Sequence, residues 1–105
     1  MTERIKKLKE AVEKAHNVKA KHEESSAIRE TFKGNALKPS TVWEGVVETF
    51  VITGHHMAKR CYAWSEEVGE ETRNTIVLEI PPVAGPRGAV RTAMVAAARQ
   101  ARPPK

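Results

Sequence analysis

Two adjacent histidines and the chain's only cysteine lie close together in the segment VITGHHMAKRCYAW, residues 51–64. Imidazole and thiolate groups bind zinc, or act together as base and nucleophile in covalent catalysis. A zinc site needs three or four converging ligands, commonly spaced as CxxC or HxxxH, and neither spacing occurs in this sequence. We therefore predict that no metal is held by His16, His22, His55, His56 and Cys61.

Catalysis by Cys61 is also not favoured. The alternation of RCYAWS, residues 60–65, places Cys61 on the core side of a strand, whereas a nucleophilic cysteine needs exposure and a stabilised thiolate. Glu44 and Glu48 would lie about 13 Å apart on one strand, beyond the separations of roughly 5 to 10 Å found in acid–base carboxylate pairs. Phosphate-binding glycine loops and hydrolase motifs do not occur. We expect a protein that is not an enzyme and needs no cofactor.

A β-hairpin accounts for the segment without chemistry. Gly54 supplies the backbone freedom of the turn, and both histidines lie in that turn, where they meet solvent. The register that we expect pairs Thr53 with Arg60. It sets Val51 opposite Tyr62 on one face of the sheet. A contact of the turn histidines with a partner stays open.

Helical periodicity precedes this hairpin and follows it. The first helix is predicted from about residue 3 to about residue 20, with Thr2 as N-cap and one apolar face of Ile5, Leu8, Val12 and Ala15. The segment KHEESS, residues 21–26, lacks periodicity and is expected to be a connector. The last helix begins near Pro86, and its buried stripe is predicted to contain Val90, Met94, Ala97 and Ala101.

Four strands are predicted between the helices. Alternation indicates a short strand from residue 27, ended at Gly34, and the segment GNALKPS that follows is a loop. Residues 41–53 form a long strand that is apolar on both faces, so something must cover each side of it. The hairpin supplies the third strand. The fourth, TIVLEI, is stopped by Pro81 and Pro82.

These elements predict one α+β domain over residues 1–105, with a frayed tail at about 102–105. We expect two layers, a helix, a four-stranded antiparallel sheet and a helix in the order α-β-β-β-β-α, with both helices on one face of the sheet. No run of eighteen apolar residues occurs, and a lone cysteine suits a reducing compartment, so we expect a cytoplasmic protein.

The net charge of +5 divides unevenly along the chain. Residues 1–40 hold 10 Lys and Arg against 6 acidic residues, residues 41–83 hold 3 against 7, and residues 84–105 hold 5 against none. Basic ends and an acidic middle indicate either an acidic partner such as nucleic acid, or two charged surfaces that complement each other.

The sheet face left bare by the helices is predicted to carry an aromatic patch of Trp43, Val47, Val51, Arg60, Tyr62 and Trp64. An exposed patch of this kind usually marks a partner, and symmetric self-association is its commonest outcome, so we expect a homodimer on this face. Alternatives are a small molecule or peptide, unpaired RNA bases stacked on the aromatics, or cover by loops or the first helix.

A second surface is basic. Arg87, Arg91 and Arg99 share one row of the last helix, and the free amides at a helix N-terminus favour anions. Together with the first helix, this surface predicts binding of nucleic acid or another polyanion through Arg87, Arg91, Arg99, Lys6, Lys7 and Lys14. A solubilising basic face is the simpler alternative.

The layout of a first helix, an antiparallel sheet and a basic last helix resembles the double-stranded-RNA-binding domain. TGHHMAKR lies where that family has its strand-connecting loop. The family has paired lysines at the start of its final helix, which this sequence lacks, and Arg87 and Arg91 are their loose counterparts. This sequence differs from the family by one extra predicted strand. The resemblance is an analogy of layout, because one fold hosts many functions.

Overall fold

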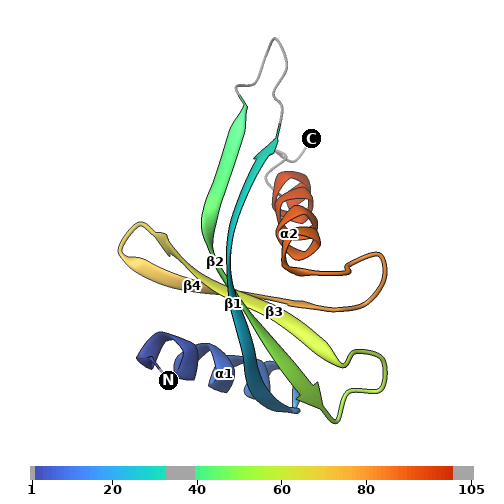
Figure 1. Cartoon of the computed structure of the whole chain (residues 1–105). Coiled ribbons are helices and arrows are strands. Elements are labelled where there is room, and N and C mark those ends of the chain that lie inside the picture. Colours follow the sequence, from blue (N-terminus) through green and yellow to red (C-terminus); the bar gives the residue numbers. More distant parts are fainter. Residues whose placement is uncertain (1, 33–39, 101–105) are drawn as a thin grey trace.

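The computed structural model describes residues 2–32 and 40–100, which form two helices and four strands (Figure 1). Their bounds are α1 Glu3–His16, β1 Lys19–Phe32, β2 Thr41–Thr53, β3 Arg60–Val68, β4 Glu71–Leu78 and α2 Pro86–Gln100. The strands form one antiparallel sheet in the order β1-β2-β3-β4, which confirms the α+β class and the order of elements. The expected Gly34 strand end, all but the last residue of the expected loop, Ala101 and the tail at 102–105 lie outside the described residues.

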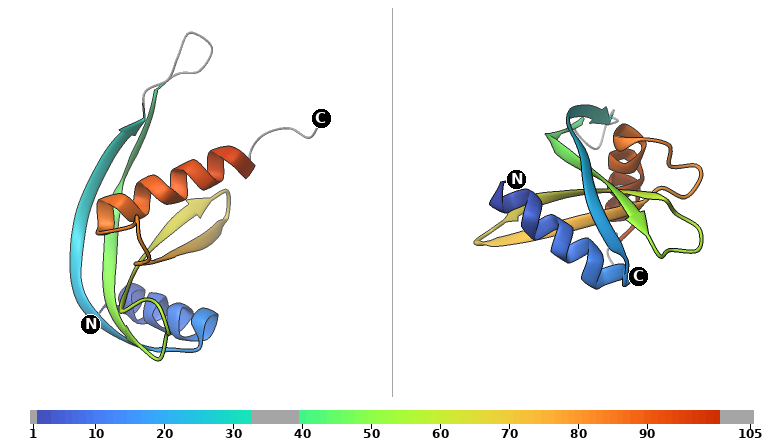
Figure 2. Two further views of the ribbon diagram at one scale, coloured as in Figure 1. Left: turned by 90° about the vertical axis from the view of Figure 1, so that its right-hand side faces the viewer. Right: turned by 60° about the horizontal axis from the view of Figure 1, so that its bottom comes forward.

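The two helices cover opposite faces of the sheet (Figure 2). Cys61 and Ala63 of β3 pack in one core cluster with α1, whereas Tyr62 and Trp64 pack in a second cluster with α2. The prediction that both helices share one face is wrong. A helix's apolar stripe shows which of its sides is buried, but not which face of the sheet it meets. The expectation that something covers each side of β2 is confirmed, because α1 lies over one side and α2 over the other.

The first helix is shorter than predicted. Thr2 caps it as expected, since its Oγ1 accepts the N–H of Ile5 at 3.3 Å. The helix ends at His16, because Asn17 adopts the left-handed conformation with φ 52° and its N–H donates to the carbonyl of Glu13. None of the helices in the described part of the chain is long and apolar enough to cross a membrane.

Strand β1 begins at Lys19, so the prediction of a connector over residues 21–26 is wrong. A β-bulge between His22 and Glu24 inserts one extra residue, Glu23, into the pairing with β2. The insertion reverses which side chains face which helix. His22 therefore lies on the α1 side against Phe50, whereas Ile28 packs in the α2 cluster. This change of phase is why the segment shows no alternation.

The hairpin of β2 and β3 differs from the predicted register by two residues. Val51 lies opposite Arg60 and Thr49 opposite Tyr62. The hairpin closes one step beyond this ladder, where the N–H of Ile52 donates to the carbonyl of Lys59 at 2.9 Å. A shift of two residues keeps every side chain on its predicted face.

Strand β1 forms one edge of the sheet, and α1 protects that edge. The N–H of Ala20 donates to Oε2 of Glu13 on α1 at 2.9 Å, so it is not free to pair with another strand. This hydrogen bond is the main reason that the pKa of Glu13 is lowered. The charge of Lys9 adds to the effect, and burial opposes it less strongly. The bulge at Glu23 also twists the same edge.

Candidate functional site

The predicted aromatic patch is enclosed by the protein's own chain. Val47 is 0% exposed, and Tyr62 and Trp64 are each 2% exposed, because α2 lies over them. Trp43 and Val51 are half-buried. The expectation of a bare aromatic face is therefore wrong, and a dimer formed on it would first have to displace α2.

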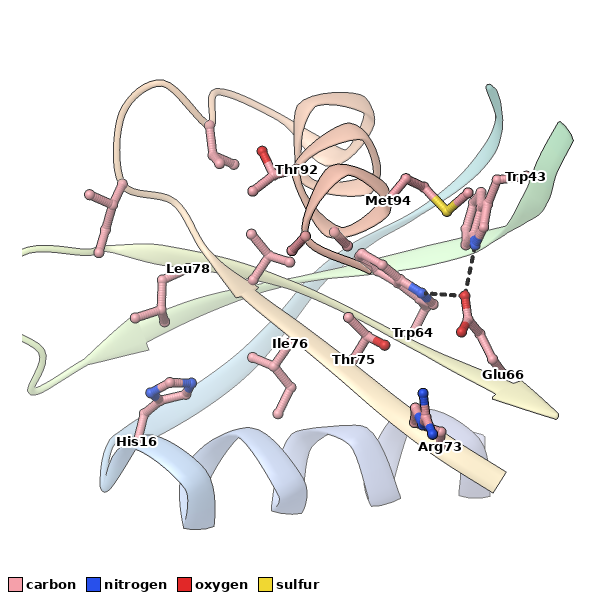
Figure 3. Close-up of a pocket in the computed structure, with 15 residues that line it drawn as sticks. His16, Trp43, Trp64, Glu66, Arg73, Thr75, Ile76, Leu78, Thr92 and Met94 are labelled. Carbon is pink, nitrogen blue, oxygen red and sulfur yellow. Dashed lines mark hydrogen bonds between the residues drawn. The ribbon is translucent and has the colours of Figure 1, made fainter. Parts of the chain in front are cut away.

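Both tryptophans are held by one carboxylate at the end of this cluster (Figure 3). Oε1 of Glu66 accepts the indole N–H of Trp43 at 2.8 Å and that of Trp64 at 3.1 Å. The two rings meet edge to face at 5.5 Å between centroids. Gly45 makes room for Trp43, since a Cβ at this position would lie 3.0 Å from the indole ring.

Arg60 does not join the aromatic cluster. Its guanidinium is exposed and donates to both carboxylate oxygens of Glu23, at 2.9 and 3.1 Å, so the bulge residue anchors it. The neighbouring Tyr62 hydroxyl donates to Oε2 of Glu79. Burial, together with this hydrogen bond, raises the pKa of Tyr62.

The basic residues at the start of α2 are paired within the molecule. Nη1 of Arg87 and Nε of Arg91 each lie 3.1 Å from Oε1 of Glu30, whose side chain is buried. Burial alone would raise the pKa of Glu30, but the hydrogen bonds and charges of the two arginines outweigh it and lower the pKa. Arg87 also donates to the carbonyl of Arg29.

The basic surface is consequently divided. Lys6, Lys7 and Lys14 are exposed on α1, which lies on the opposite side of the sheet from Arg87 and Arg91. The side chain of Arg99 lies outside the described part of the structure. Polyanion binding stays a prediction, although these residues do not form one continuous cationic surface.

The cysteine and the turn histidines have structural partners. Cys61 is buried under α1, and burial raises the pKa of its thiol to about 12, so the thiolate is not available near neutral pH. Nδ1 of His55 accepts the N–H groups of Met57 and Ala58, each at 3.0 Å, which shapes the turn.

Sequence spacing did not indicate that three histidines meet. His55 stacks on His56 and lies 6.5 Å from His16 of α1, measured between ring centroids. Within residues 2–32 and 40–100, however, no three His, Cys, Asp or Glu side chains are arranged to hold a metal ion.

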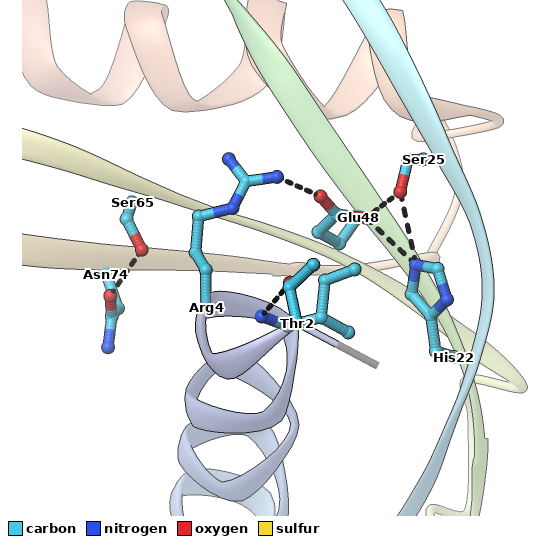
Figure 4. A network of polar contacts seen from close by, with 8 residues as sticks. Thr2, Arg4, His22, Ser25, Glu48, Ser65 and Asn74 are labelled. Carbon is cyan, nitrogen blue, oxygen red and sulfur yellow. Dashed lines mark hydrogen bonds and ion pairs between the residues drawn. The ribbon is translucent and has the colours of Figure 1, made fainter.

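A buried glutamate on the α1 face was also missed by the sequence reasoning (Figure 4). Glu48 is 0% exposed and contacts Arg4 of α1, Nε2 of His22 at 2.9 Å, and the hydroxyl of Ser25. The residue types are those of a catalytic triad, but the serine hydroxyl donates directly to Glu48, and one histidine nitrogen faces both groups. A triad needs the acid and the serine on different ring nitrogens. This cluster instead gives the buried Glu48 carboxylate a cation and hydrogen-bond donors.

A groove of about 640 Å³ runs along the outer edge of β4, and we call it the edge groove. Its lining includes Arg73, Thr75, Ile76, Val77 and Leu78 of β4, Trp64 of β3, and Thr92, Met94 and Ala96 of α2. Consecutive residues of a strand point to opposite faces, yet a run of them from β4 lines the groove. The groove therefore follows the edge of the strand, with α2 beside it (Figure 3).

The outer edge of β4 carries unpaired backbone groups. The N–H of Glu79 donates to the carbonyl of Arg60, and alternation then directs the odd-numbered residues of β4 toward β3. The N–H and C=O groups of Thr72, Asn74 and Ile76 point away from the sheet. No strand in the described residues pairs with this edge. The sequence feature that indicates this edge is TIVL, residues 75–78, which is apolar on both faces of the strand as β2 is.

Comparisons with known proteins do not identify this chain: no protein-family model, no curated protein and no solved structure matches it.

Proposed function

We propose that the protein acts by association with other polypeptide, through addition of an extended strand to the outer edge of β4. The observation that carries this proposal is the edge groove, where free backbone N–H and C=O groups lie between apolar side chains of β4 and α2. An added strand gains main-chain hydrogen bonds from such an edge, and its alternate side chains enter the flanking pockets. This proposal moves the predicted association from the face of the sheet to its edge.

The half-buried residues of β4 support the same assignment. Ile76 and Leu78 pack against the α1 cluster, and Val77 packs against the α2 cluster, yet each keeps part of its surface exposed at the edge. Natural sheets usually protect an edge with charge, proline or a bulge. Residues 75–78 of β4 carry none of these.

A proline at the outer edge tests the proposal. Asn74→Pro removes an outward N–H while leaving the bonds to β3, and Asn74→Ala is the matched control, because both lose the bond from Ser65 but only proline loses the backbone donor. The chain, immobilised too sparsely for copies to meet, is offered an array of random ten-residue peptides. We expect the unaltered chain and Asn74→Ala to retain peptides with alternating β-branched residues, and Asn74→Pro to retain none. Equal retention by all three variants, or retention by none, contradicts the proposal.

A cytoplasmic location belongs to this proposal, since a single reduced thiol at Cys61 suits that compartment. Polyanion binding through the basic helices has weaker support, because Arg87 and Arg91 are already paired with Glu30.

A further inference from the structure

We infer that the strand added at the edge groove is β4 of a second copy of this chain, paired antiparallel about a two-fold axis through Ile76. This inference rests on the function proposed above and names its partner. The result would be one continuous eight-stranded sheet, with the two copies of α1 on one face and the two copies of α2 on the other.

Two charged residues carry the argument, Arg73 on β4 and Glu79 just after it. Arg73 is exposed and has no hydrogen bond or ion pair with any of the described residues. Glu79 accepts the Tyr62 hydroxyl through Oε2 and is attracted to the charge of Arg60, but its other oxygen accepts no hydrogen bond in the described part of the chain. Both side chains lie on the α2 face: Arg73 alternates in step with Val77 of the α2 cluster, and Glu79 reaches Tyr62 of the same cluster.

The spacing of these two residues makes the edge complementary to itself. In an antiparallel pair centred on Ile76, Arg73 of each copy stands opposite Glu79 of the other, so the ion pair forms twice. Thr75 and Val77 become opposite neighbours in the same way. Ile76 has outward N–H and C=O groups, as a hydrogen-bonded pair on the axis requires. Leu78 then stands opposite Asn74 and can donate its N–H, whereas its carbonyl already accepts the N–H of Ile80.

Two neighbouring registers lose this complementarity. In the neighbouring register, the outward N–H and C=O groups of the two strands still face each other, but Glu71 stands opposite Glu79 and Arg73 opposite Val77. This register places like charges together and leaves Arg73 without an acidic partner. A shift in the same direction by two further residues sets Arg73 opposite Thr75. Charge therefore favours the pairing through Ile76 over these two registers. A pairing through Thr72 also sets Arg73 opposite an acid, Glu71, but the two strands then overlap only at residues 71–73.

Two charge reversals test this register in the full-length chain, with sedimentation velocity as the readout. Arg73→Glu brings Glu opposite Glu79 in its own dimer, and Glu79→Lys brings Lys opposite Arg73. We expect each variant alone to dimerise at least about tenfold more weakly than the unaltered chain. An equimolar mixture of the two variants should recover dimers, because every opposed pair in the mixed dimer is again of opposite charge.

The control variant is Lys21→Glu, which makes the same change of charge at an exposed site on β1 and should leave dimerisation unchanged. Far-ultraviolet circular dichroism confirms that each variant is folded, since Glu79→Lys removes the acceptor of Tyr62. Folded variants whose mixture stays monomeric overturn the register. A chain that stays monomeric at all concentrations while it selects peptides in an Asn74→Pro-sensitive way overturns the self-pairing and leaves the proposed function standing. Failure of both experiments removes the proposed function itself.

Discussion

The two faces of the sheet solve the same packing problem in different ways. Under α1 the helix and the sheet both contribute bulk, through Leu8 and Val12 of the helix and Phe50 of β2, and β3 contributes small residues such as Ala63. Under α2 the bulk comes from the sheet, chiefly Trp64, and the helix contributes small residues such as Ala89. Large residues against small ones allow close contact in both cases. The difference shows that α2 depends on the sheet's aromatic residues for its position, whereas α1 brings its own apolar anchors.

Each face also buries one glutamate of the sheet against arginine from the covering helix. Glu48 meets a single arginine, Arg4, with His22 and Ser25 beside it. Glu30 meets two arginines, Arg87 and Arg91. The α2 side therefore keeps one guanidinium if the other is lost, and the α1 side does not.

The largest expected effect is on the aromatic side. Trp64→Ala should lower the free energy of unfolding by about 3–5 kcal/mol, because it empties the space on which α2 rests. Urea denaturation followed by circular dichroism measures the loss. Val95→Ala, at an exposed position of α2, is the control and should change stability by less than about 0.5 kcal/mol. Equal losses in the two variants would show that α2 does not depend on the tryptophan.

The arginines provide a sharper contrast between the faces. Arg4→Met should cost about 2 kcal/mol, below the usual cost of breaking a buried pair because Arg4 is partly exposed and Glu48 keeps His22 and Ser25. Arg87→Met should cost less, since Arg91 still contacts Glu30. Unfolding in urea compares the two variants, and the reverse order would refute the idea that the second arginine provides a reserve.

The next effect is a gain in stability, expected on removal of the Thr49 hydroxyl on the α2 side. It should be smaller than the losses above. Oγ1 of Thr49 is the buried side-chain polar atom for which the described residues offer no hydrogen-bond partner. Thr49→Val keeps the shape and removes the unsatisfied hydroxyl, so stability should rise by about 1 kcal/mol. Thermal unfolding measures the change, with Thr53→Val at an exposed position as control. A loss of stability would mean that the hydroxyl is satisfied in solution.

The smallest effect concerns pH. The pKa of Glu30 is lowered in the folded protein from its ordinary value of 4.5, so its ionised form contributes stability above that value. This contribution is lost as the pH falls through the lowered pKa. Glu30→Gln should therefore be less stable than the unaltered chain at neutral pH, and the gap should narrow as the pH falls below about 4.5. Urea midpoints measured across this range test the expectation, and a constant gap would contradict it.

Local pattern predicted the element order and the faces of the strands, but not long-range placement. The bounds of β2 and the burial of Val90 followed from apolar alternation and periodicity. The side of the sheet that α2 covers depends on where the chain passes after Ile80, which no local pattern encodes. The bulge at Glu23 hid half of β1 by changing the phase of its alternation. The burial of Glu48 could not be predicted, because its partners come from α1 and β1, distant in sequence.

The hydrogen bond between Glu13 and Ala20 bears on how far assembly can go. If two copies join through β4, the outer strands of the joined sheet are both β1, and at each of them the N–H of Ala20 is held by a carboxylate of its own chain. Further growth at β1 is disfavoured there, because one outward donor is already taken at Ala20 and the bulge at Glu23 twists the same edge. A side chain far from the contact thereby works against the open-ended growth that produces fibres.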